Sequence, residues 1–397
     1  MRKKMKIVTA VLSVLSLLCM VLLVFGYYML PQTMTVSGEL PTIGKIYTPD
    51  TMHNDAVYAA SMDEEVGITQ ETYSLFGSVP VKTVSVVHSD RKTVYVGGDV
   101  IGLQMLTDGV VIADVQAFDG ENGSVSPAKD AGLQKGDLVT SINGTEITDN
   151  YGFVSAIENC NGESIELTVL RQNEQLTLSV LPQKCKSTGK YRCGAWVKDS
   201  TVGIGTMTYY DPQTGVYGAL GHSVCDAQSG EMLPIAGGQI VDAYVWNIKK
   251  GESGTAGELG GSLQEEVIGS IEKNCQSGIY GFLYEEPLCA GEYPVAWATE
   301  VKAGPAEIML SLDGEKIENY DVNIKRINAD YNAEIKNMVI EITDEELLEK
   351  TGGIVQGMSG SPIVQNGMLV GAVTHVLVND PTQGYGIFIE NMLNAAA

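Results

Sequence analysis

The sequence predicts a mainly β protein preceded by one apolar helix near the N-terminus. Among its 397 residues are 45 glycines and only 6 phenylalanines, a composition typical of turn-rich β proteins. Short apolar runs bounded by turn residues recur along the chain, as in successive strands. The single long apolar stretch, residues 7–26, has the length of a membrane-spanning helix.

The N-terminal segment has a basic start and an apolar continuation. Four of the first six residues are Lys or Arg, and the apolar run 7–26 follows directly. Basic residues favour the cytoplasmic side of a membrane, and the pair Tyr27 and Tyr28 suits the opposite interface. We therefore predict that residues 1–30 form a cytoplasmic stub and an uncleaved transmembrane anchor, with the rest outside the cytoplasm. A cleaved signal peptide is the alternative.

Residues 126–144 carry the pattern of a small ligand-binding module. A short helix ends at Gly132, a turn follows, and a strand then leads to the turn Asn143-Gly144. This stretch resembles the centre of a bacterial PDZ domain, an α+β fold. We place that domain at residues 88–185, after a linker and an entry strand at residues 31–87.

PDZ domains bind extended peptides by adding a strand to a sheet edge. By resemblance, the loop that captures a terminal carboxylate is expected at Ile101, Gly102 and Leu103. The alternative is that these apolar residues belong to the core. The ligand could be the tail of a partner protein, a segment of a membrane protein, or this chain itself.

Residues 357–362, Gly-Met-Ser-Gly-Ser-Pro, are the most informative motif of the chain. Trypsin-like peptidases present their nucleophile in such a setting, because glycines let main-chain N–H groups approach a substrate carbonyl. Two apolar runs joined by Asn366-Gly367 follow, which predicts a β-hairpin behind Ser359. A Gly/Ser turn without chemistry is the alternative.

A serine nucleophile needs a base, and the chain has only four histidines. His222 follows a strand-like run in a setting of small residues, and we favour it. His375 lies on an apolar strand and is the second candidate. His53 lies in a polar stretch, and His88 is expected at the surface end of a strand.

A carboxylate should orient the base, but the 49 acidic residues do not allow a choice from composition. Asp344, Asp226 and Asp380 are the nearby candidates, and the residues alone do not rank them. Asp344 is also a good N-cap for the helix expected after it.

Several segments together resemble the stage IV sporulation protein B family of serine peptidases. They are residues 75–77, 80–84, 203–206, 219–222, 352–362, 371–376, 379–381 and 384–386. The resemblance implies a triad of His222, Asp344 and Ser359, and an oxyanion hole formed by the N–H groups of Gly357 and Ser359. It also implies a membrane-tethered signalling peptidase that triggers a membrane-embedded processing complex during sporulation, acting in the forespore intermembrane space.

The composition limits the partners and cofactors. A net charge of −24 argues against binding to nucleic acid and against electrostatic attachment to anionic lipid. The seven cysteines show no zinc-site spacing, so we expect neither a metal nor another cofactor. Cys225 is the one thiol near the proposed chemistry, and a cysteine nucleophile is the minor alternative.

The predicted organisation ends with a trypsin-like, β-barrel-type serine peptidase domain at residues 190–397. The expected function is regulated cleavage of a protein partner, and the partner is expected to be a membrane protein. The alternatives are a general quality-control protease with a PDZ domain and a non-catalytic PDZ scaffold.

Overall fold

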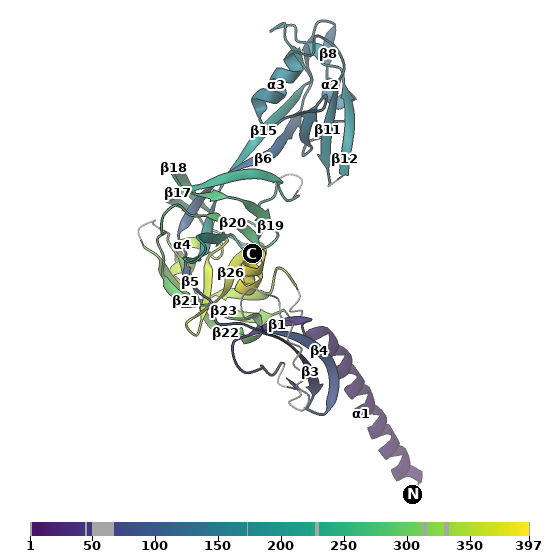
Figure 1. Cartoon of the computed structure of the whole chain (residues 1–397), viewed down its shortest axis with the longest axis vertical. Coiled ribbons are helices and arrows are strands. Elements are labelled where there is room, and N and C mark those ends of the chain that lie inside the picture. The colour runs from purple at the N-terminus through teal and green to yellow at the C-terminus, as the bar shows by residue number, and fades with distance from the viewer. Residues whose placement is uncertain are drawn as a thin grey trace.

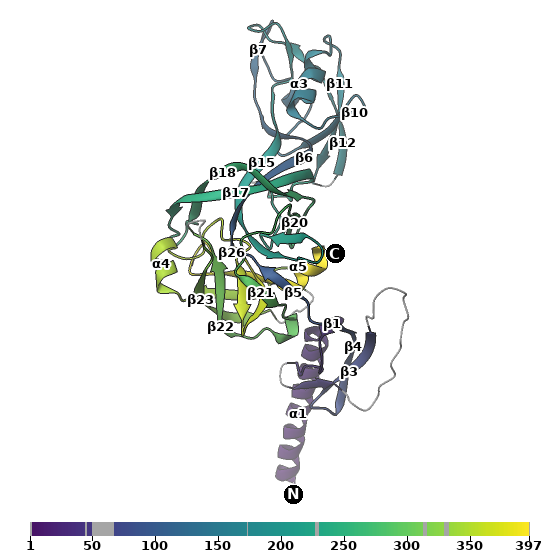
Figure 2. The ribbon, with the colours of Figure 1, turned by 60° about the vertical axis from the view of Figure 1, so that its left-hand side comes forward.

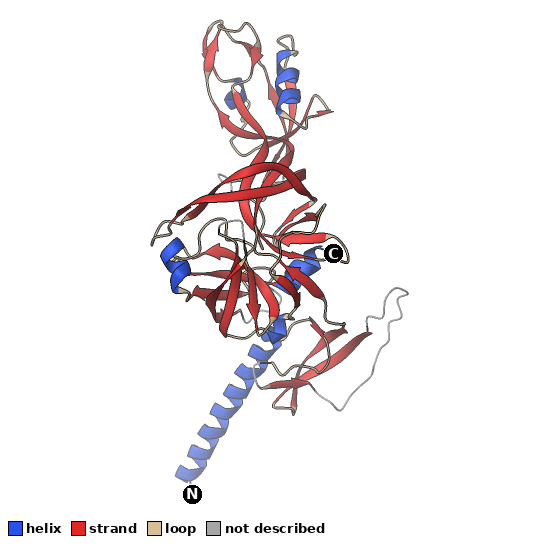
Figure 3. Ribbon diagram, turned by 90° about the vertical axis from the view of Figure 1, so that its left-hand side faces the viewer, coloured by secondary structure: helices blue, strands red, loops and turns tan. Residues whose placement is uncertain are grey.

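The computed structural model describes residues 2–43, 46–49, 67–172, 174–226, 230–312, 316–328 and 333–396. The molecule is elongated, with the N-terminal helix at one end and the predicted PDZ region at the other (Figure 1). Between them lies a β-rich body, one part of which is a closed barrel. Strands dominate the ribbon and helices are few, so the mainly β prediction is confirmed (Figure 3).

Helix α1 (Arg2–Met29) contains the predicted apolar run. Its segment Met5–Met29 has a hydropathy of 2.9 and is long and apolar enough to cross a membrane. The C-terminal end of the helix contacts a small sheet (Figure 2). There the Tyr47 hydroxyl donates to the Leu22 carbonyl at 2.7 Å, and Lys82 Nζ donates to the Leu30 carbonyl at 2.6 Å.

The small sheet lies where we predicted a linker and one entry strand, residues 31–87. Its strands are β1 (Thr33–Val36), β2 (Tyr47–Pro49), β3 (Gly67–Leu75) and β4 (Val79–His88), in the order β1-β4-β3-β2. Strands β1 and β2 are only four and three residues long, too short to show a periodicity, and the apolar residues of the sheet are buried against one another and the helix end. Strand β4 pairs with β1 and β3 instead of entering the PDZ sheet. His53 lies outside the described residues.

The PDZ region packs two helices against a twisted sheet. Strand order is β12-β11-β9-β6-β15, and the core gathers Val110, Ile112, Phe153, Ile157 and Leu167. The elements are β6 (Val100–Val115), β7 (Phe118–Gly120), β8 (Gly123–Val125), α2 (Pro127–Asp130), β9 (Leu138–Ile142), β10 (Thr145–Glu146), α3 (Asn150–Glu158), β11 (Ile165–Arg171), β12 (Glu174–Val180), β13 (Gln183–Lys184) and β14 (Tyr191–Arg192).

The body has a first sheet that is continuous with the PDZ sheet through β6 and β15. Tyr209, Tyr217, Ile240 and Ile279 are among its buried residues. Its remaining strands are β5 (Thr93–Val96), β15 (Ala195–Tyr210), β16 (Val216–Ala219), β17 (Ile235–Lys249), β18 (Glu258–Ile271), β19 (Lys273–Cys275), β20 (Gly278–Phe282) and β21 (Gly291–Pro294).

The second part of the body is a closed barrel in the order β22-β23-β24-β27-β26-β25. The predicted hairpin is present, since β25 and β26 pair around Asn366-Gly367, both with positive φ. The elements are a 3-10 turn (Ala298–Glu300), β22 (Gly304–Leu310), β23 (Glu318–Ile327), β24 (Met338–Ile342), α4 (Glu345–Thr351), β25 (Pro362–Gln365), β26 (Met368–Val376), β27 (Gln383–Phe388) and α5 (Ile389–Ala396).

Strands β6 and β15 run through both the first sheet and the PDZ sheet. They pair from Ala195↔Val115 in the PDZ region to Thr206↔Val100 in the body. The first part of β6 also pairs with β17, so the body begins before the PDZ region and resumes after it. The body therefore includes β5 and the first part of β6, which lie within the range predicted for the PDZ domain, and the PDZ sheet includes the first part of β15, which lies within the range predicted for the peptidase domain.

Candidate active site

Ser359 lies in a loop that requires glycine on both sides. Gly357 has φ +100° and Gly360 has φ +98°, in the region that L side chains rarely adopt. A Cβ at Gly360 would collide with the carbonyl oxygen of Thr206, and one at Gly357 would lie 3.0 Å from Leu259. The glycines let the nucleophile loop of the closed barrel approach the main chain of the first sheet.

Hydrogen bonds fix this loop against strand β15. The Thr206 N–H donates to the Ser359 carbonyl at 2.9 Å, and the Thr206 hydroxyl donates to the Gly357 carbonyl at 2.8 Å. The Ser359 hydroxyl donates to the carbonyl of Thr374 on β26 at 2.7 Å. Ser359 therefore sits at the junction of the two parts of the body, with its Oγ on a main-chain acceptor.

His222 lies just after β16 at the end of a sharp turn. Leu220 and Gly221 have φ +67° and +68°, and this left-handed pair redirects the chain after the strand. The Nδ1 atom of His222 lies 2.8 Å from the Ser223 carbonyl. With the proton on Nδ1 donated to that carbonyl, Nε2 carries the lone pair, which is the tautomer that a general base requires.

The electrostatic setting keeps His222 neutral. Burial lowers the pKa of His222 below its ordinary value of 6.5, and the hydrogen bond to Ser223 opposes this only in part. His375 packs beside it, with ring centroids 4.7 Å apart and planes tilted by 40°. Burial, with His222 and Lys336 nearby, lowers the pKa of His375 to about 4, although part of this side chain reaches solvent.

Ser359 and both histidines open into one cavity of about 550 Å³. Gly357, Thr374 and the edge of β15 also line it. A neighbouring cavity of about 410 Å³ shares Val202, Gly203, Ile204, Gln356 and Gly357 with the first. Together the two cavities form a groove large enough for several residues of a peptide.

The main-chain donors of the predicted oxyanion hole lie on this groove. Within the described part of the chain, neither the N–H of Gly357 nor that of Ser359 has a hydrogen-bond acceptor. Buried main-chain donors are almost always paired. Two unpaired N–H groups beside a candidate nucleophile are therefore available to stabilise negative charge on an oxygen. They could bind the carbonyl oxygen of a substrate.

Among the described residues, Asp344 makes no hydrogen bond to His222, although the resemblance implies that the two belong to one triad. Its carboxylate accepts from the N–H of Leu347 at 2.8 Å and caps α4. Asp226 forms an ion pair with Lys198 at 2.8 Å, and Asp380 binds Thr382 and Gln383. The contact of His222 Nδ1 is the Ser223 carbonyl, so a main-chain oxygen stands where a carboxylate was expected.

Ile101, Gly102 and Leu103 do not form the predicted PDZ loop. They lie in β6 between β15 and β17, in the body, and Ile101 and Leu103 are 0% and 2% exposed. A Cβ on Gly102 would collide with the side chains of Leu263 and Val241. The prediction was wrong because β6 continues straight into the PDZ region, so the core alternative holds.

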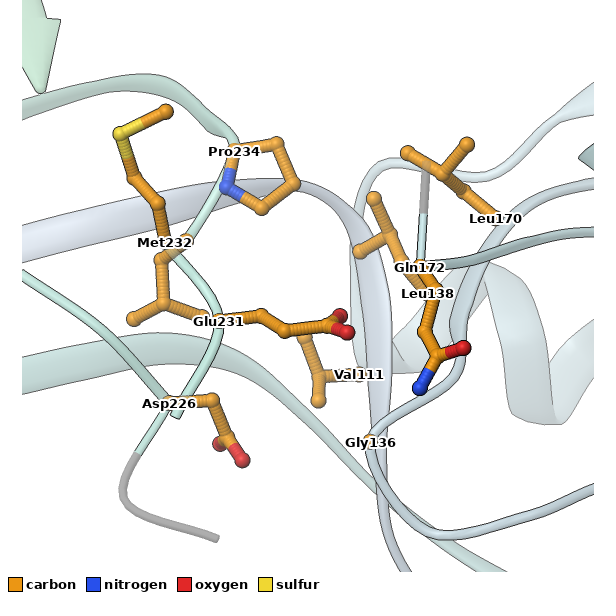
Figure 4. Close-up of a pocket in the computed structure, with 10 residues that line it drawn as sticks. Val111, Gly136, Leu138, Leu170, Gln172, Asp226, Glu231, Met232 and Pro234 are labelled. Atoms are coloured by element: carbon orange, nitrogen blue, oxygen red, sulfur yellow. The ribbon is translucent and has the colours of Figure 1, made fainter. Parts of the chain in front are cut away.

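A further cavity of about 430 Å³ lies at the junction of the PDZ sheet and the body. Figure 4 shows Val111, Leu138 and Leu170 on one side and Met232 and Pro234 on the other. The segment 230–234 that walls this cavity lies a few residues after His222. Val224, two residues after His222, packs against the cluster that Leu233 forms with Val111 and Leu138 of the PDZ sheet.

Sequence reasoning missed Thr206 and Thr374, which hold the nucleophile loop. Thr206 lies in the motif 203–206 that was quoted for the resemblance, which is the signal that could have found it. Thr374 lies in the motif 371–376, which was quoted for the same resemblance. In the described ranges, no group of three His, Cys, Asp or Glu side chains is placed to hold a metal ion.

Both modules of the chain match models of known families. Residues 189–393, about half of the chain, match the family model described as SpoIVB peptidase S55. Residues 100–181 match the PDZ domain model. These matches cover the two modules that the sequence predicted.

Individual relatives share only parts of the chain. A protein described as a zinc metalloprotease of Lactococcus lactis subsp. lactis is 34% identical over 98 residues, which is 25% of this chain and 21% of that protein. The chain thus spans about a fifth of the length of this curated relative.

Two solved structures have low overall similarity. The PDZ domain of an SdrC-like protein from Listeria monocytogenes has 21% identity and a TM-score of 0.19, covering 23% of this chain and 87% of its own. The Rv3671c protease in its inactive form has 12% identity and a TM-score of 0.26, covering 48% of this chain and 81% of its own.

Proposed function

The chain belongs to the SpoIVB peptidase S55 family, and from that premise we propose that it is a membrane-anchored serine endopeptidase that cleaves a protein partner as a signal during sporulation. The cleavage would activate a membrane-embedded processing complex. The family match, the PDZ domain and the apolar helix α1 support this proposal. A site outside the cytoplasm, in the forespore intermembrane space, is part of the same proposal.

The observation that carries the proposal is the common cavity of Ser359 and His222. In the proposed reaction, His222 removes the proton of Ser359 Oγ as the oxygen attacks the substrate carbonyl. The N–H groups of Gly357 and Ser359 bind the oxyanion, and His222 then protonates the leaving amine. Water repeats these steps and releases the acyl group. For attack, the Ser359 hydroxyl must leave the Thr374 carbonyl and turn to His222.

Labelling of Ser359 with a fluorophosphonate tests the proposal. We expect the full-length protein in detergent to be labelled, Ser359→Ala to lose the label, and His222→Ala to react at least a hundredfold more slowly. Ser361→Ala is the matched control, because its hydroxyl donates to the Met358 carbonyl inside the same loop. Equal labelling of the wild type and Ser359→Ala would contradict the assignment.

The signalling role is tested separately from the chemistry. A signalling enzyme should leave casein intact while it cuts a membrane-protein partner, whereas a quality-control protease should digest casein. Digestion of casein at a rate comparable with that of the partner would favour the second function. Absence of fluorophosphonate labelling in a folded protein would favour the PDZ scaffold.

A further inference from the structure

The hairpin that joins β3 to β4 has an exposed apolar tip, residues 76–80. Phe76 is 65% exposed, Val79 is 39% exposed, and Pro80 is exposed as well. No charged residue lies in this segment. Residues 75–77 are among the motifs quoted for the resemblance, but the proposed reaction makes no use of them.

The turn holds Phe76 in a backbone conformation that a bulky side chain rarely adopts. Phe76 has φ +51° and Gly77 has φ +67°. The Ser78 N–H donates to the Leu75 carbonyl at 3.1 Å and closes the turn. A hairpin turn with two left-handed central residues favours Asn-Gly, so phenylalanine in the first position is strained. Such strain is typical of residues with a function, and this exposed ring gains little packing in return.

The tip lies beside the apolar helix α1 (Figure 2). Across the sheet, Tyr47 on β2 pairs with Leu75 on β3, which in turn pairs with Val79 on β4. The Tyr47 hydroxyl reaches the Leu22 carbonyl of the helix, and a Cβ at Gly26 would collide with the Tyr47 ring. The row of the sheet next to the tip therefore packs against this part of the helix.

Strand β4 runs from the tip toward the C-terminal end of α1. Pro80 lines a cavity of about 380 Å³ together with Leu23 and Tyr27 of the helix. Lys82, two residues further along β4, donates to the carbonyl of Leu30. The contacts of β4 thus move toward the C-terminal end of the helix as the strand proceeds. The tip, which precedes the strand, therefore points toward the N-terminal half of α1.

The length of the apolar run places this contact inside a bilayer. At 1.5 Å per residue, residues 7–26 span about 30 Å, which is the thickness of the hydrocarbon core. Residues 7–18 are exposed on the helix, and packing against the core of the small sheet begins at Cys19. Residues 7–18 alone span only about 18 Å. When the whole run is in hydrocarbon, the sheet therefore reaches about 10 Å below the membrane surface.

We infer that the hairpin tip is a second membrane contact, in which Phe76, Val79 and Pro80 insert between lipid acyl chains beside α1. The partner is the leaflet at the C-terminal end of the helix. Apolar and aromatic side chains are stable at this depth, and Lys82 Nζ lies 5.3 Å from the centre of the Tyr27 ring, a pair suited to the headgroup level. This inference rests on the uncleaved anchor of the proposed function.

The small sheet is joined to the body, so insertion of the tip would set the position of the catalytic site above the membrane. The Trp297 side chain donates to the Ser37 hydroxyl at 3.4 Å, and Arg91, just after β4, forms an ion pair with Glu300 at 2.7 Å. A single helix leaves the body free to turn about the helix axis. A second contact removes that freedom and would favour substrate bonds at one height.

Phe76→Trp tests the inference in the full-length protein reconstituted in phosphatidylcholine vesicles. We expect lipid brominated near the carbonyl end of an acyl chain to quench about half of the added fluorescence, whereas iodide in the water should not quench it. The three native tryptophans give the background, measured on the wild type. Thr83→Trp is the matched control, because Thr83 is exposed on β4 about 14 Å from Val79 and should show the reverse pattern.

Val79→Trp is a second reporter that leaves Phe76 and its turn unchanged, and the same quenching by brominated lipid is expected. Quenching by iodide and not by brominated lipid, in either folded variant, would overturn the inference. Protection from both quenchers would also overturn it, because protein would then cover the tip.

Two measurements separate this inference from the proposed function. Mass spectrometry should show that residues 1–30 are retained, and their loss would overturn the anchor and the membrane contact together. Fluorophosphonate labelling of Ser359 should be unchanged in Phe76→Trp and Val79→Trp. Its absence from the wild type would overturn the peptidase function and leave the membrane contact standing.

Discussion

At the residue scale, the site combines a serine on a main-chain acceptor with a histidine fixed by a main-chain carbonyl. Ser359 Oγ lies 2.7 Å from the Thr374 carbonyl, and His222 Nδ1 lies 2.8 Å from the Ser223 carbonyl. Since both partners are main-chain atoms, no substitution removes them directly. The protonation state of the site therefore depends on the side chains of His222 and His375.

The acid limb of the pH profile, measured on the wild type and on a His375 variant, distinguishes the two histidines. A general base must be neutral, and burial lowers the pKa of His222, so kcat/KM should lose half its value at a pH below 6.5. If His375 were the base, the midpoint would lie near its pKa of about 4. His375→Gln should preserve the limb of the wild type in a peptide-cleavage assay, and loss of all cleavage in this variant would assign the base to His375.

At the element scale, the short helix α4 leads into the nucleophile loop. Asp344 caps its first turn, and Gly352 ends it with φ +72°. The Thr351 carbonyl then accepts from the Gly251 N–H at 2.8 Å, which fixes the helix end to the loop between β17 and β18. Because the segment 352–359 leads straight to Ser359, a loosened helix would misplace the nucleophile.

Asp344 is therefore expected to act as a cap. Asp344→Ala should lower the free energy of unfolding by about 1 kcal/mol and reduce peptide cleavage, whereas Asp344→Asn should retain most of both, since Asn caps as well as Asp. Thermal melting and kcat/KM measured on both variants check this. Stability unchanged in Asp344→Asn with a hundredfold loss of kcat would instead identify the orienting carboxylate of the predicted triad.

At the scale of the whole molecule, the PDZ region is inserted between two neighbouring strands of the body. Leu106 on β6 faces Ser200 on β15, just where the two strands leave the body. Leu233, in the segment after His222, packs with Val111 and Leu138 of the PDZ sheet. The inserted module therefore touches both the strand that borders the groove and the segment that follows the base.

Because the PDZ region is inserted into the body, we predict that it can be removed without unfolding the body. Replacement of residues 107–199 by Asn-Gly should join Leu106 to Ser200 by a two-residue hairpin and leave a folded body. Circular dichroism melting and fluorophosphonate labelling of Ser359 would measure the outcome. Removal of residues 107–200 with the same turn is the control, because a one-residue slip should turn side chains to the wrong face and destabilise the product. An unfolded product from the first excision would contradict an independent body.

The sequence alone determined the features that depend on neighbouring residues. The glycines around Ser359, the hairpin at Asn366-Gly367, the apolar run of α1 and the PDZ core were predicted because each requires only a local pattern. The family followed from the same motifs, and the match over residues 189–393 confirms it.

Only the tertiary structure decided which distant segments meet. That β6 runs straight between β15 and β17, and so buries Ile101 and Leu103, depends on strand partners more than 90 residues away in the sequence. The contact of His222 Nδ1 with the Ser223 carbonyl depends on the turn geometry after β16. The capping role of Asp344, by contrast, followed from the local sequence. Local sequence patterns cannot show which of the 49 acidic residues contacts the catalytic base. That contact depends on the distance between side chains in the folded protein.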